Sequence, residues 1–150
     1  MKVLTVLVPT YNVEKYLRRC LDSLLLPEVL EEIEVLVVND GSKDGSADIA
    51  RAYEKKYPQT VVFVDKENGG HGSTINVGIE KAQGTYFKVL DSDDWVNIGD
   101  FIEFVKRLKE ETADAVICDY RKEHVYNGKS EYFEYKDLED GKKYNLNEID

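Results

Sequence analysis

Short apolar runs alternate with amphipathic helical patterns along residues 3–118, and this alternation constrains the fold more than any other feature. The run at 3–8 is almost continuously apolar, which is typical of a strand buried on both faces. Similar runs follow at 33–38, 60–64, 86–90 and 115–118. Strands that alternate with helices through short linkers predict an α/β fold, in which helices flank a mostly parallel sheet on both faces.

The helices between these runs have recognisable ends. We expect the first helix between Val13 and Pro27, because apolar residues recur there on one stripe and proline disfavours helix in the residue before it. Ser46 is the expected N-cap of the second helix. The apolar pattern predicts the third helix over 73–83 and the fourth over about 100–111.

The character of the sequence changes after the last apolar run. Strand patterns at 123–125 and 131–135 flank Asn127-Gly128, a dipeptide that favours a tight hairpin turn. The rest of the chain is polar and has no clear core periodicity. We therefore expect one domain over 1–120 and the start of a second region over 121–150, cut from a longer protein.

Composition excludes several functional classes. A chain of 150 residues that is 42% hydrophobic suits one compact domain with a core. The net charge of −10 argues against nucleic acid as a partner, since binding it requires Lys and Arg on the phosphates. No apolar stretch approaches the roughly 20 residues of a membrane span, and the N-terminus lacks the form of a signal peptide. We expect a cytoplasmic protein, with any membrane association residing outside this chain, and two buried free thiols at Cys20 and Cys118.

Polar or glycine-rich segments follow four of the predicted strands, at 9–12, 39–44, 65–72 and 91–95. In open parallel sheets, ligands bind beyond the carboxyl ends of the strands, where the strand order reverses. Because the four segments fall on that one edge of the sheet, we expect them to form a single binding site.

The last of these segments holds three carboxylates, at Asp91, Asp93 and Asp94. Crowded carboxylates repel one another, and at least one pKa rises unless a cation joins them. Mg²⁺ and Mn²⁺ prefer oxygen ligands and are often completed by substrate phosphates, so Asp93 with Asp91 could hold a metal that bridges a pyrophosphate. The alternative is an acidic helix N-terminus, where the helix dipole favours aspartate.

The other segments suggest contacts to a nucleotide. The carboxylate of Asp40 could accept a hydrogen bond from the N–H edge of a pyrimidine base, and Tyr11 could stack on that base. The glycines at 68–73 would let the backbone approach a phosphate at the start of a helix, with His71 as a candidate cationic contact. Each of these residues could instead be simply solvated.

Taken together and in order, these segments resemble family 2 glycosyltransferases of the GT-A fold. The resemblance extends over about residues 3–118, and the ordered set is specific although each motif is short. The matching strings lie at 8–12, 37–46, 68–70, 76–79, 82–84 and 90–95. The resemblance implies a Rossmann-like three-layer sandwich that transfers a sugar, with inversion, from a nucleotide diphosphate donor. Within the family, a UDP-sugar is the favoured donor.

The resemblance also implies roles for single residues. Asp40 would recognise the base, Asp91 would lie near the ribose and the metal, and Asp93 would ligate Mg²⁺ or Mn²⁺ as part of the family's DxD signature. The nucleotide pocket would further be lined by Pro9, Thr10, Tyr11 and Glu14.

Two features of the family are altered or missing in this sequence. Ile75 stands where the family often has an arginine, and His71 and Lys66 are candidate replacements for the phosphate contact of that arginine. The family's general base, which deprotonates the acceptor, belongs to the C-terminal half, so we expect it beyond residue 150 and assign no catalytic residue. This chain would then hold the donor site within 1–120 and only the start of the acceptor-side region in 121–150, and it would transfer little sugar alone.

The acceptor and the setting are implied only at the level of the family. Family acceptors include glycans, lipid carriers and proteins, and the implied setting is synthesis of cell-envelope polysaccharide. A non-catalytic module of the same fold, binding a nucleotide or a metal without chemistry, is the main alternative. A nucleotidyltransferase would also combine an α/β sheet with a metal, but it requires a basic glycine-rich loop after the first strand, and residues 9–12 lack one.

Overall fold

The computed structural model describes residues 1–145 of the chain. It divides into two compact units, Met1–Glu110 and Glu111–Asp150, which are described one at a time below. The first unit contains the sheet and the helices that the apolar pattern predicts, and the second contains a hairpin. Residues 146–150 of the predicted acceptor-side region lie outside the described residues.

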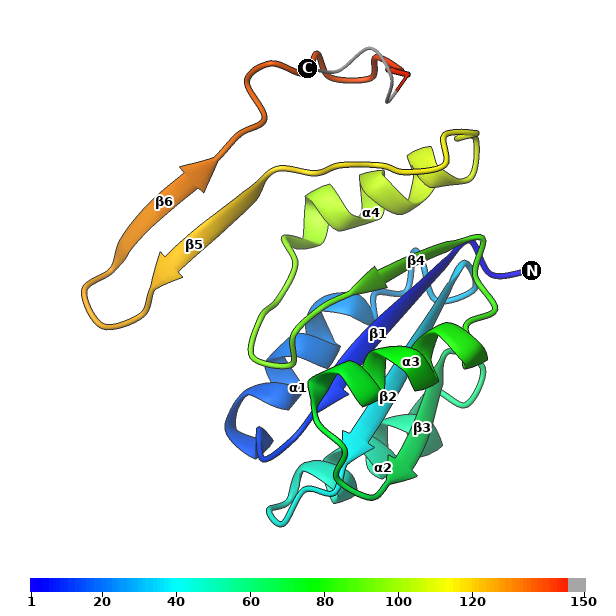
Figure 1. The fold of residues 1–150 in the computed structure, drawn as a ribbon, viewed down its shortest axis with the longest axis vertical. Helices are drawn as coiled ribbons and strands as arrows, with labels where there is room; N and C mark the ends of the chain where they lie inside the picture. The colour runs from blue at the N-terminus through cyan, green and yellow to red at the C-terminus, as the bar shows by residue number, and fades with distance from the viewer. Residues whose placement is uncertain (146–150) are drawn as a thin grey trace. The chain divides into compact units, whose positions relative to one another are not determined.

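The first unit is built on one parallel sheet (Figure 1). The strand order is β3-β2-β1-β4, and every neighbouring pair of strands is parallel. Because β2 and β3 lie on one side of β1 and β4 lies on the other, the strand order reverses at β1. The strands are β1 (Leu4–Thr10), β2 (Ile33–Asp40), β3 (Val61–Lys66) and β4 (Tyr86–Val89).

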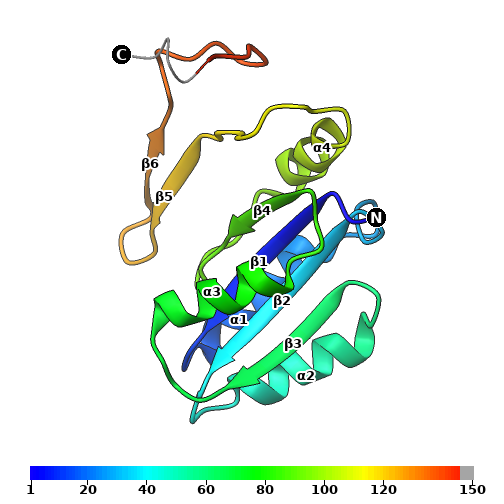
Figure 2. The same cartoon turned by 45° about the vertical axis from the view of Figure 1, so that its right-hand side comes forward.

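Helices cover both faces of this sheet, as Figures 1 and 2 show, with α3 on one face and α1 and α2 on the other. The first unit's helices are α1 (Glu14–Leu24), α2 (Ser46–Lys56), α3 (His71–Lys81) and α4 (Ile98–Leu108). Right-handed crossovers of this kind are the usual way to join parallel strands. The prediction of an α/β fold with a mostly parallel sheet is therefore confirmed.

The hydrophobic core lies against both faces of β1 and β2, whose residues are buried along their whole length. Side chains of α1, α2 and α4 join the larger cluster on one face, while Leu7, Leu36 and Val38 meet α3 on the other. Each fully buried aliphatic side chain contributes about 1.5–3 kcal/mol to folding. The continuous apolar runs of the sequence are explained by this burial on both sides of the sheet.

Gly78 lets α3 lie close to the sheet. A Cβ built on Gly78 would come within 2.6 Å of the Leu7 side chain, so a larger residue would push the helix away from β1. The same helix begins with His71, one of the candidate site residues.

Several predicted boundaries move by a few residues. The strands β1 and β2 extend to Thr10 and Asp40, so residues expected in loops belong to strand ends. Gly45 is the N-cap of α2 and Ser46 is its first residue, and the hydroxyl oxygen of Ser46 accepts a hydrogen bond from the backbone N–H of Val13 at 2.9 Å. The helix α3 begins at His71, before the predicted start, and α4 begins after Asn97, whose side chain accepts from the N–H of Asp100.

The second unit contains the predicted hairpin. The strands β5 (Tyr120–His124) and β6 (Lys129–Phe133) pair antiparallel, and Gly128 adopts the positive φ of 66° that the turn requires. The rings of Tyr120 and Phe133 stack with centroids 4.7 Å apart.

The predicted fifth strand at 115–118 is wrong. This segment pairs with no strand among the described residues, and Val116 and Ile117 are 41% and 57% exposed. Apolar β-branched residues form a strand only where a partner strand supplies hydrogen bonds and a surface to pack on. Cys118, expected to be buried, is exposed for the same reason, whereas Cys20 is buried as predicted.

Among residues 1–145, no helix has both the length and the apolar character needed to cross a membrane.

Candidate functional site

A cavity of about 530 Å³ opens at the carboxyl edge of the parallel sheet. It lies where the strand order reverses, which is the usual ligand position in such sheets. All four polar segments singled out in the sequence reach it. Its lining residues are Pro9, Thr10, Tyr11, Val13, Asp40, Asn68, Gly70, His71, Thr74, Asp91, Ser92 and Asp93. Of the predicted nucleotide and metal residues, all except Glu14 line this cavity.

Glu14 instead ties two loops together. Its side-chain oxygen accepts a hydrogen bond from the N–H of Gly45 at 2.7 Å, and its own N–H donates to the carboxylate of Asp44 at 3.1 Å. Asn12, in the left-handed conformation at a φ of 51°, accepts from the N–H of Lys43 at 2.8 Å. These bonds fix the loop after β1 against the loop after β2, and thereby hold Tyr11 at the rim, where its side chain is half exposed.

Asp40 is the best-held carboxylate of the site. It is 3% exposed, and its Oδ1 accepts from the N–H of Gly69 at 2.9 Å and from the Lys66 ammonium at 2.5 Å. Its Oδ2 accepts from the N–H of Gly70 at 2.8 Å. Gly70 can present its N–H in this way because it adopts a φ of 83°. Burial tends to raise the pKa of Asp40, but the hydrogen bonds from Lys66, Gly69 and Gly70 outweigh it and hold the pKa below its ordinary value.

The ammonium of Lys66 is fully occupied inside the protein. Besides Asp40, it donates to the backbone oxygen of Glu67 at 2.6 Å and to the hydroxyl oxygen of Ser73 at 2.8 Å. An ammonium has three N–H bonds, and all three are used here. We name Asp40, Lys66, Gly69, Gly70 and Ser73 the Asp40 cluster. The candidate role of Lys66 as a replacement phosphate contact does not fit this geometry.

Residues 90–97, between β4 and α4, are called the acidic loop below. A turn brings the N–H of Asp94 within 2.9 Å of the carbonyl oxygen of Asp91. The three carboxylates of this turn are therefore crowded. Burial, and then the charges of Asp93 and Asp91, raise the pKa of Asp94, while Arg19 opposes the rise. The pKa of Asp94 in the acidic loop is thus raised, whereas the pKa of Asp40 is lowered.

The acidic loop offers oxygen ligands to a divalent cation. Asp91 and Asp93 both line the cavity, and carboxylate oxygens suit Mg²⁺ and Mn²⁺. Within residues 1–145 there is no group of three or more His, Cys, Asp and Glu side chains placed to hold a metal by themselves. A cation held by Asp91 and Asp93 would complete its shell with substrate phosphate and water, which is the usual arrangement for Mg²⁺.

The position of Ile75 is explained by packing. Ile75 joins the smaller hydrophobic cluster with Leu7, Leu36 and Val38, between α3 and the sheet. It cannot contact a phosphate from there. His71, the first residue of α3, lines the cavity and remains the candidate for that contact.

Other residues of the site escape sequence reasoning. Asn68 anchors its loop by donating from its side chain to the backbone oxygen of Asp40 at 3.0 Å. Arg19 donates from its guanidinium to the backbone oxygen of Asp93, 74 positions further along the chain, at 3.3 Å. Neither motif spacing nor helical periodicity signals such contacts, because both depend on how distant loops meet.

Comparison with known proteins places this chain in a family. The family model described as Glycosyl transferase family 2 matches residues 5–146. A relative named Putative glycosyltransferase EpsH, from Bacillus subtilis (strain 168), is 41% identical over 126 residues, which are 84% of this chain and 36% of the relative. Glycosyltransferase GlyA of Streptococcus pneumoniae is 38% identical over 78% of this chain and 16% of its own length.

Solved structures agree in fold. Residues 1–349 of TarS from S. aureus, in complex with UDP-GlcNAc, match with a TM-score of 0.62 and 35% identity, over 73% of this chain and 32% of that one. The mannosyltransferase PcManGT from Pyrobaculum calidifontis, in complex with GDP-Man and Mn²⁺, matches with a TM-score of 0.61 and 27% identity, over 69% of this chain and 31% of that one. The chain thus spans about a third or less of the length of these proteins. The fold, the ordered motifs and the match over residues 5–146 lead to one conclusion: this chain belongs to glycosyl transferase family 2.

Proposed function

We propose that this chain carries the donor site of a metal-dependent, inverting glycosyltransferase, and that a nucleotide diphosphate sugar binds in the cavity at the carboxyl edge of the sheet. One observation carries the proposal: a single cavity is lined by Tyr11, Asp40, Asp91 and Asp93, which come from the ends of three different strands. Membership of a family of sugar transferases supports it.

Asp40 would bind the base. Its Oδ1 already accepts two hydrogen bonds and its Oδ2 accepts one, so Oδ2 keeps capacity for one more donor. The N3–H of uracil is such a donor. Tyr11, half exposed at the rim, would stack on the base, with Pro9 and Thr10 forming the floor at the end of β1. The complex of TarS with UDP-GlcNAc favours a UDP-sugar as donor.

Asp91 and Asp93 would hold the divalent cation and the diphosphate, with Asp91 also near the ribose. A bound Mg²⁺ or Mn²⁺ would neutralise the diphosphate and stabilise charge on the departing nucleoside diphosphate. The complex of PcManGT with GDP-Man and Mn²⁺ supports a cation of this kind. Glu14 would support the pocket indirectly, by holding the loop after β2 against the loop after β1.

His71 would supply the remaining protein contact to the diphosphate. It begins α3, and the N-terminus of a helix attracts anions through its backbone N–H groups and its dipole. Ile75 is committed to packing and Lys66 to the Asp40 cluster, so of these three candidate positions His71 is the one proposed to contact a phosphate.

The second half of the reaction belongs to residues outside this chain. The proposed general base deprotonates an acceptor hydroxyl for in-line attack on the anomeric carbon, and we place it beyond residue 150. The acceptor would be a glycan, a lipid carrier or a protein of the cell envelope, in keeping with the relative named Minor teichoic acid biosynthesis protein GgaB. We propose a cytoplasmic location.

Calorimetric titration tests the proposal. UDP, GDP, dTDP and CDP are each titrated into the folded chain with Mn²⁺ and again with EDTA. We expect binding of UDP that requires Mn²⁺, and negligible sugar transfer by the chain alone. Mn²⁺-dependent binding of a different nucleotide would correct the choice of base. Binding of none of them to a folded sample would contradict the donor site and favour a non-catalytic module of the same fold.

A further inference from the structure

The helix α1 contacts the acidic loop through three side chains on one face. Arg19 donates to the backbone oxygen of Asp93 at 3.3 Å, and the thiol of Cys20 lies 3.8 Å from the backbone oxygen of Asp91. One turn further along, the hydroxyl of Ser23 accepts from the N–H of Val96 at 3.2 Å. Positions 19, 20 and 23 share a face of a helix, so α1 presents these groups together.

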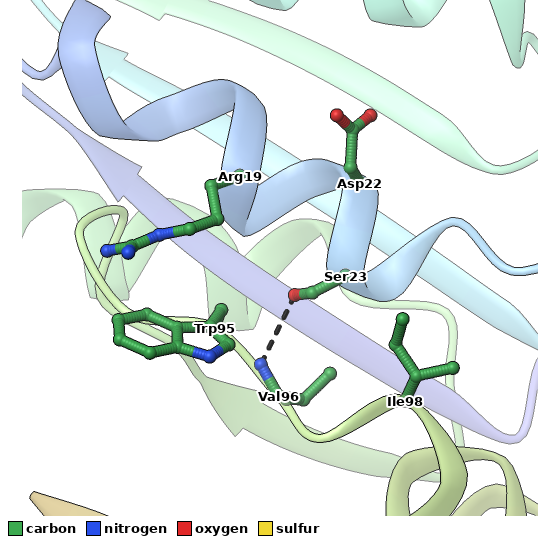
Figure 3. Close-up of a pocket in the computed structure, with 6 residues that line it drawn as sticks. All are labelled: Arg19, Asp22, Ser23, Trp95, Val96 and Ile98. Carbon is green, nitrogen blue, oxygen red and sulfur yellow. Dashed lines mark hydrogen bonds between the residues drawn. The ribbon is translucent and has the colours of Figure 1, made fainter. Parts of the chain in front are cut away.

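Trp95 extends this contact on the outer side of the loop. The guanidinium carbon of Arg19 lies 3.7 Å from the centre of the Trp95 ring, well inside the range of a cation–π interaction. Figure 3 shows Arg19 reaching from α1 across the ring, and the hydrogen bond between Ser23 and Val96 beside it. The guanidinium of Arg19 therefore contacts both the backbone oxygen of Asp93 and the ring of Trp95.

These contacts act on the backbone of the two proposed cation ligands and leave their carboxylates free for the cavity. Asp91 and Asp93 line that cavity, while their carbonyl oxygens accept from α1. Groups that hold the backbone of a ligand fix the direction of its side chain, and their loss typically weakens metal affinity.

We propose that Arg19 is a positioning residue for the cation site, which sets the direction of the Asp91 and Asp93 carboxylates by clamping the acidic loop onto α1. The inference rests on the proposed donor site, since it assigns to Arg19 the geometry of that site. Cys20 and Ser23 complete the clamp from the buried side.

Electrostatics alone predicts that loss of Arg19 strengthens Mn²⁺ binding, whereas loss of a positioning residue should weaken it. This difference makes the inference testable. The positive charge of Arg19 acts on the carboxylate of Asp94 in this loop. Removing a positive charge from the side of an acidic loop makes the loop more negative and should strengthen its attraction for Mn²⁺. If Arg19 positions the loop, its removal should weaken the binding of Mn²⁺ with UDP in spite of that gain.

The experiment compares the wild-type chain with Arg19→Met, Arg19→Lys and Arg18→Met. Arg18→Met is the matched control, because it removes the same charge from the neighbouring position of α1, where the side chain acts on Tyr53 of α2. Mn²⁺-UDP binding is measured by calorimetry. We expect Arg19→Met to raise the Kd about 10-fold, Arg19→Lys to be intermediate because it keeps the charge without the planar fork, and Arg18→Met to bind as wild type does.

Hydrogen exchange supplies a second readout that needs no ligand. The amide of Asp94 is hydrogen-bonded within the clamped loop and that of Val96 to Ser23 of α1, so both should exchange faster in Arg19→Met and at the wild-type rate in Arg18→Met. Unchanged exchange of both amides, or unchanged or tighter Mn²⁺-UDP binding by Arg19→Met, would overturn the inference. If the wild-type chain binds no Mn²⁺-UDP, the proposed donor site fails, and the exchange rates still decide whether Arg19 clamps the loop.

Discussion

Asp40 and the acidic loop lie on the same cavity, but the protein holds their carboxylates in opposite ways. Asp40 is buried and surrounded by donors, namely two backbone N–H groups and the ammonium of Lys66. Asp91, Asp93 and Asp94 crowd one another, and α1 holds the backbone of Asp91 and Asp93 through Cys20 and Arg19. Donors inside the protein thus hold the Asp40 carboxylate, whereas the acidic loop is held by its backbone.

The Asp40 cluster and the acidic loop would have different roles in the proposed function. The Asp40 cluster is complete without a ligand and pre-forms the base-binding end. Crowding of carboxylates makes the acidic loop electrostatically costly, and we propose that a bound cation relieves this cost. Substitutions in the first region should therefore change stability most, and substitutions in the second should change binding most.

The largest effect is expected for Asp40→Asn. The substitution leaves the Lys66 ammonium without its anionic partner and sets an amide NH2 group against the N–H of either Gly69 or Gly70, which bind different oxygens of Asp40. Breaking a buried charge pair from one side costs about 3 kcal/mol or more in the free energy of unfolding. Urea denaturation measures the loss. Asp48→Asn, an exposed aspartate of α2, is the control and should stay within about 0.5 kcal/mol of wild type.

The pH dependence of the difference in unfolding free energy between wild type and Asp40→Asn tests the role of Asp40 further. The folded pKa of Asp40 lies below its unfolded value, so the carboxylate stabilises the fold above the unfolded value of about 3.9. This contribution disappears as the pH falls from there through the lowered folded pKa. Urea denaturation of wild type and Asp40→Asn between pH 7 and pH 3 should show a constant gap that narrows only at the acidic end. A gap that begins to narrow near pH 6 would contradict the assignment to Asp40.

Asp93→Asn should affect binding and spare stability. It removes one of two proposed carboxylate ligands, and we expect a loss of about 2 kcal/mol in Mn²⁺-UDP binding, or roughly 30-fold in Kd. Calorimetry measures the loss, and urea denaturation should show stability equal to wild type or slightly higher. A variant that binds normally, or one that loses binding only because it unfolds, would remove Asp93 from the cation site.

The smallest effect, and one of opposite sign to that of Asp40→Asn, is expected for Asp94→Asn. Asp94 has a raised pKa because burial and two neighbouring carboxylates disfavour its charge. Neutralising it should increase the free energy of unfolding by about 0.5 kcal/mol at neutral pH, since solvent screens much of the repulsion. Stability that falls by 1 kcal/mol or more, measured in the same urea series, would mean that Asp94 has a partner in the fold that outweighs the repulsion.

The parts of this molecule that were predictable from sequence depend on local periodicity. The apolar runs identified β1 and β2 because both strands are buried along their whole length. Residues 115–118 show the same pattern without a partner strand, and the prediction there was wrong. A pattern of residue types indicates a preference for burial, but a segment is buried only where another part of the chain packs against it.

Prediction of the site had the same limit, because local sequence does not show which distant segments come into contact. The rule that ligands gather at the carboxyl ends of strands was enough to bring the four polar segments to one cavity. The bonds that orient them were not predictable: Glu14 reaches Gly45, Lys66 reaches Ser73, and Arg19 covers Trp95. Each of these depends on a contact between segments whose approach no single stretch of sequence encodes.

The central claim is that the acidic loop binds a divalent cation together with a nucleoside diphosphate, and electron paramagnetic resonance of Mn²⁺ tests it most directly. Free hydrated Mn²⁺ gives a strong signal that weakens when the ion is bound. We predict that adding the wild-type chain to Mn²⁺ and UDP lowers this signal further than UDP alone does, by an amount that corresponds to one bound ion per chain. At the same concentrations, Asp93→Asn should cause no such further loss. A signal that the wild-type chain leaves unchanged, or that both chains lower equally, would contradict the account.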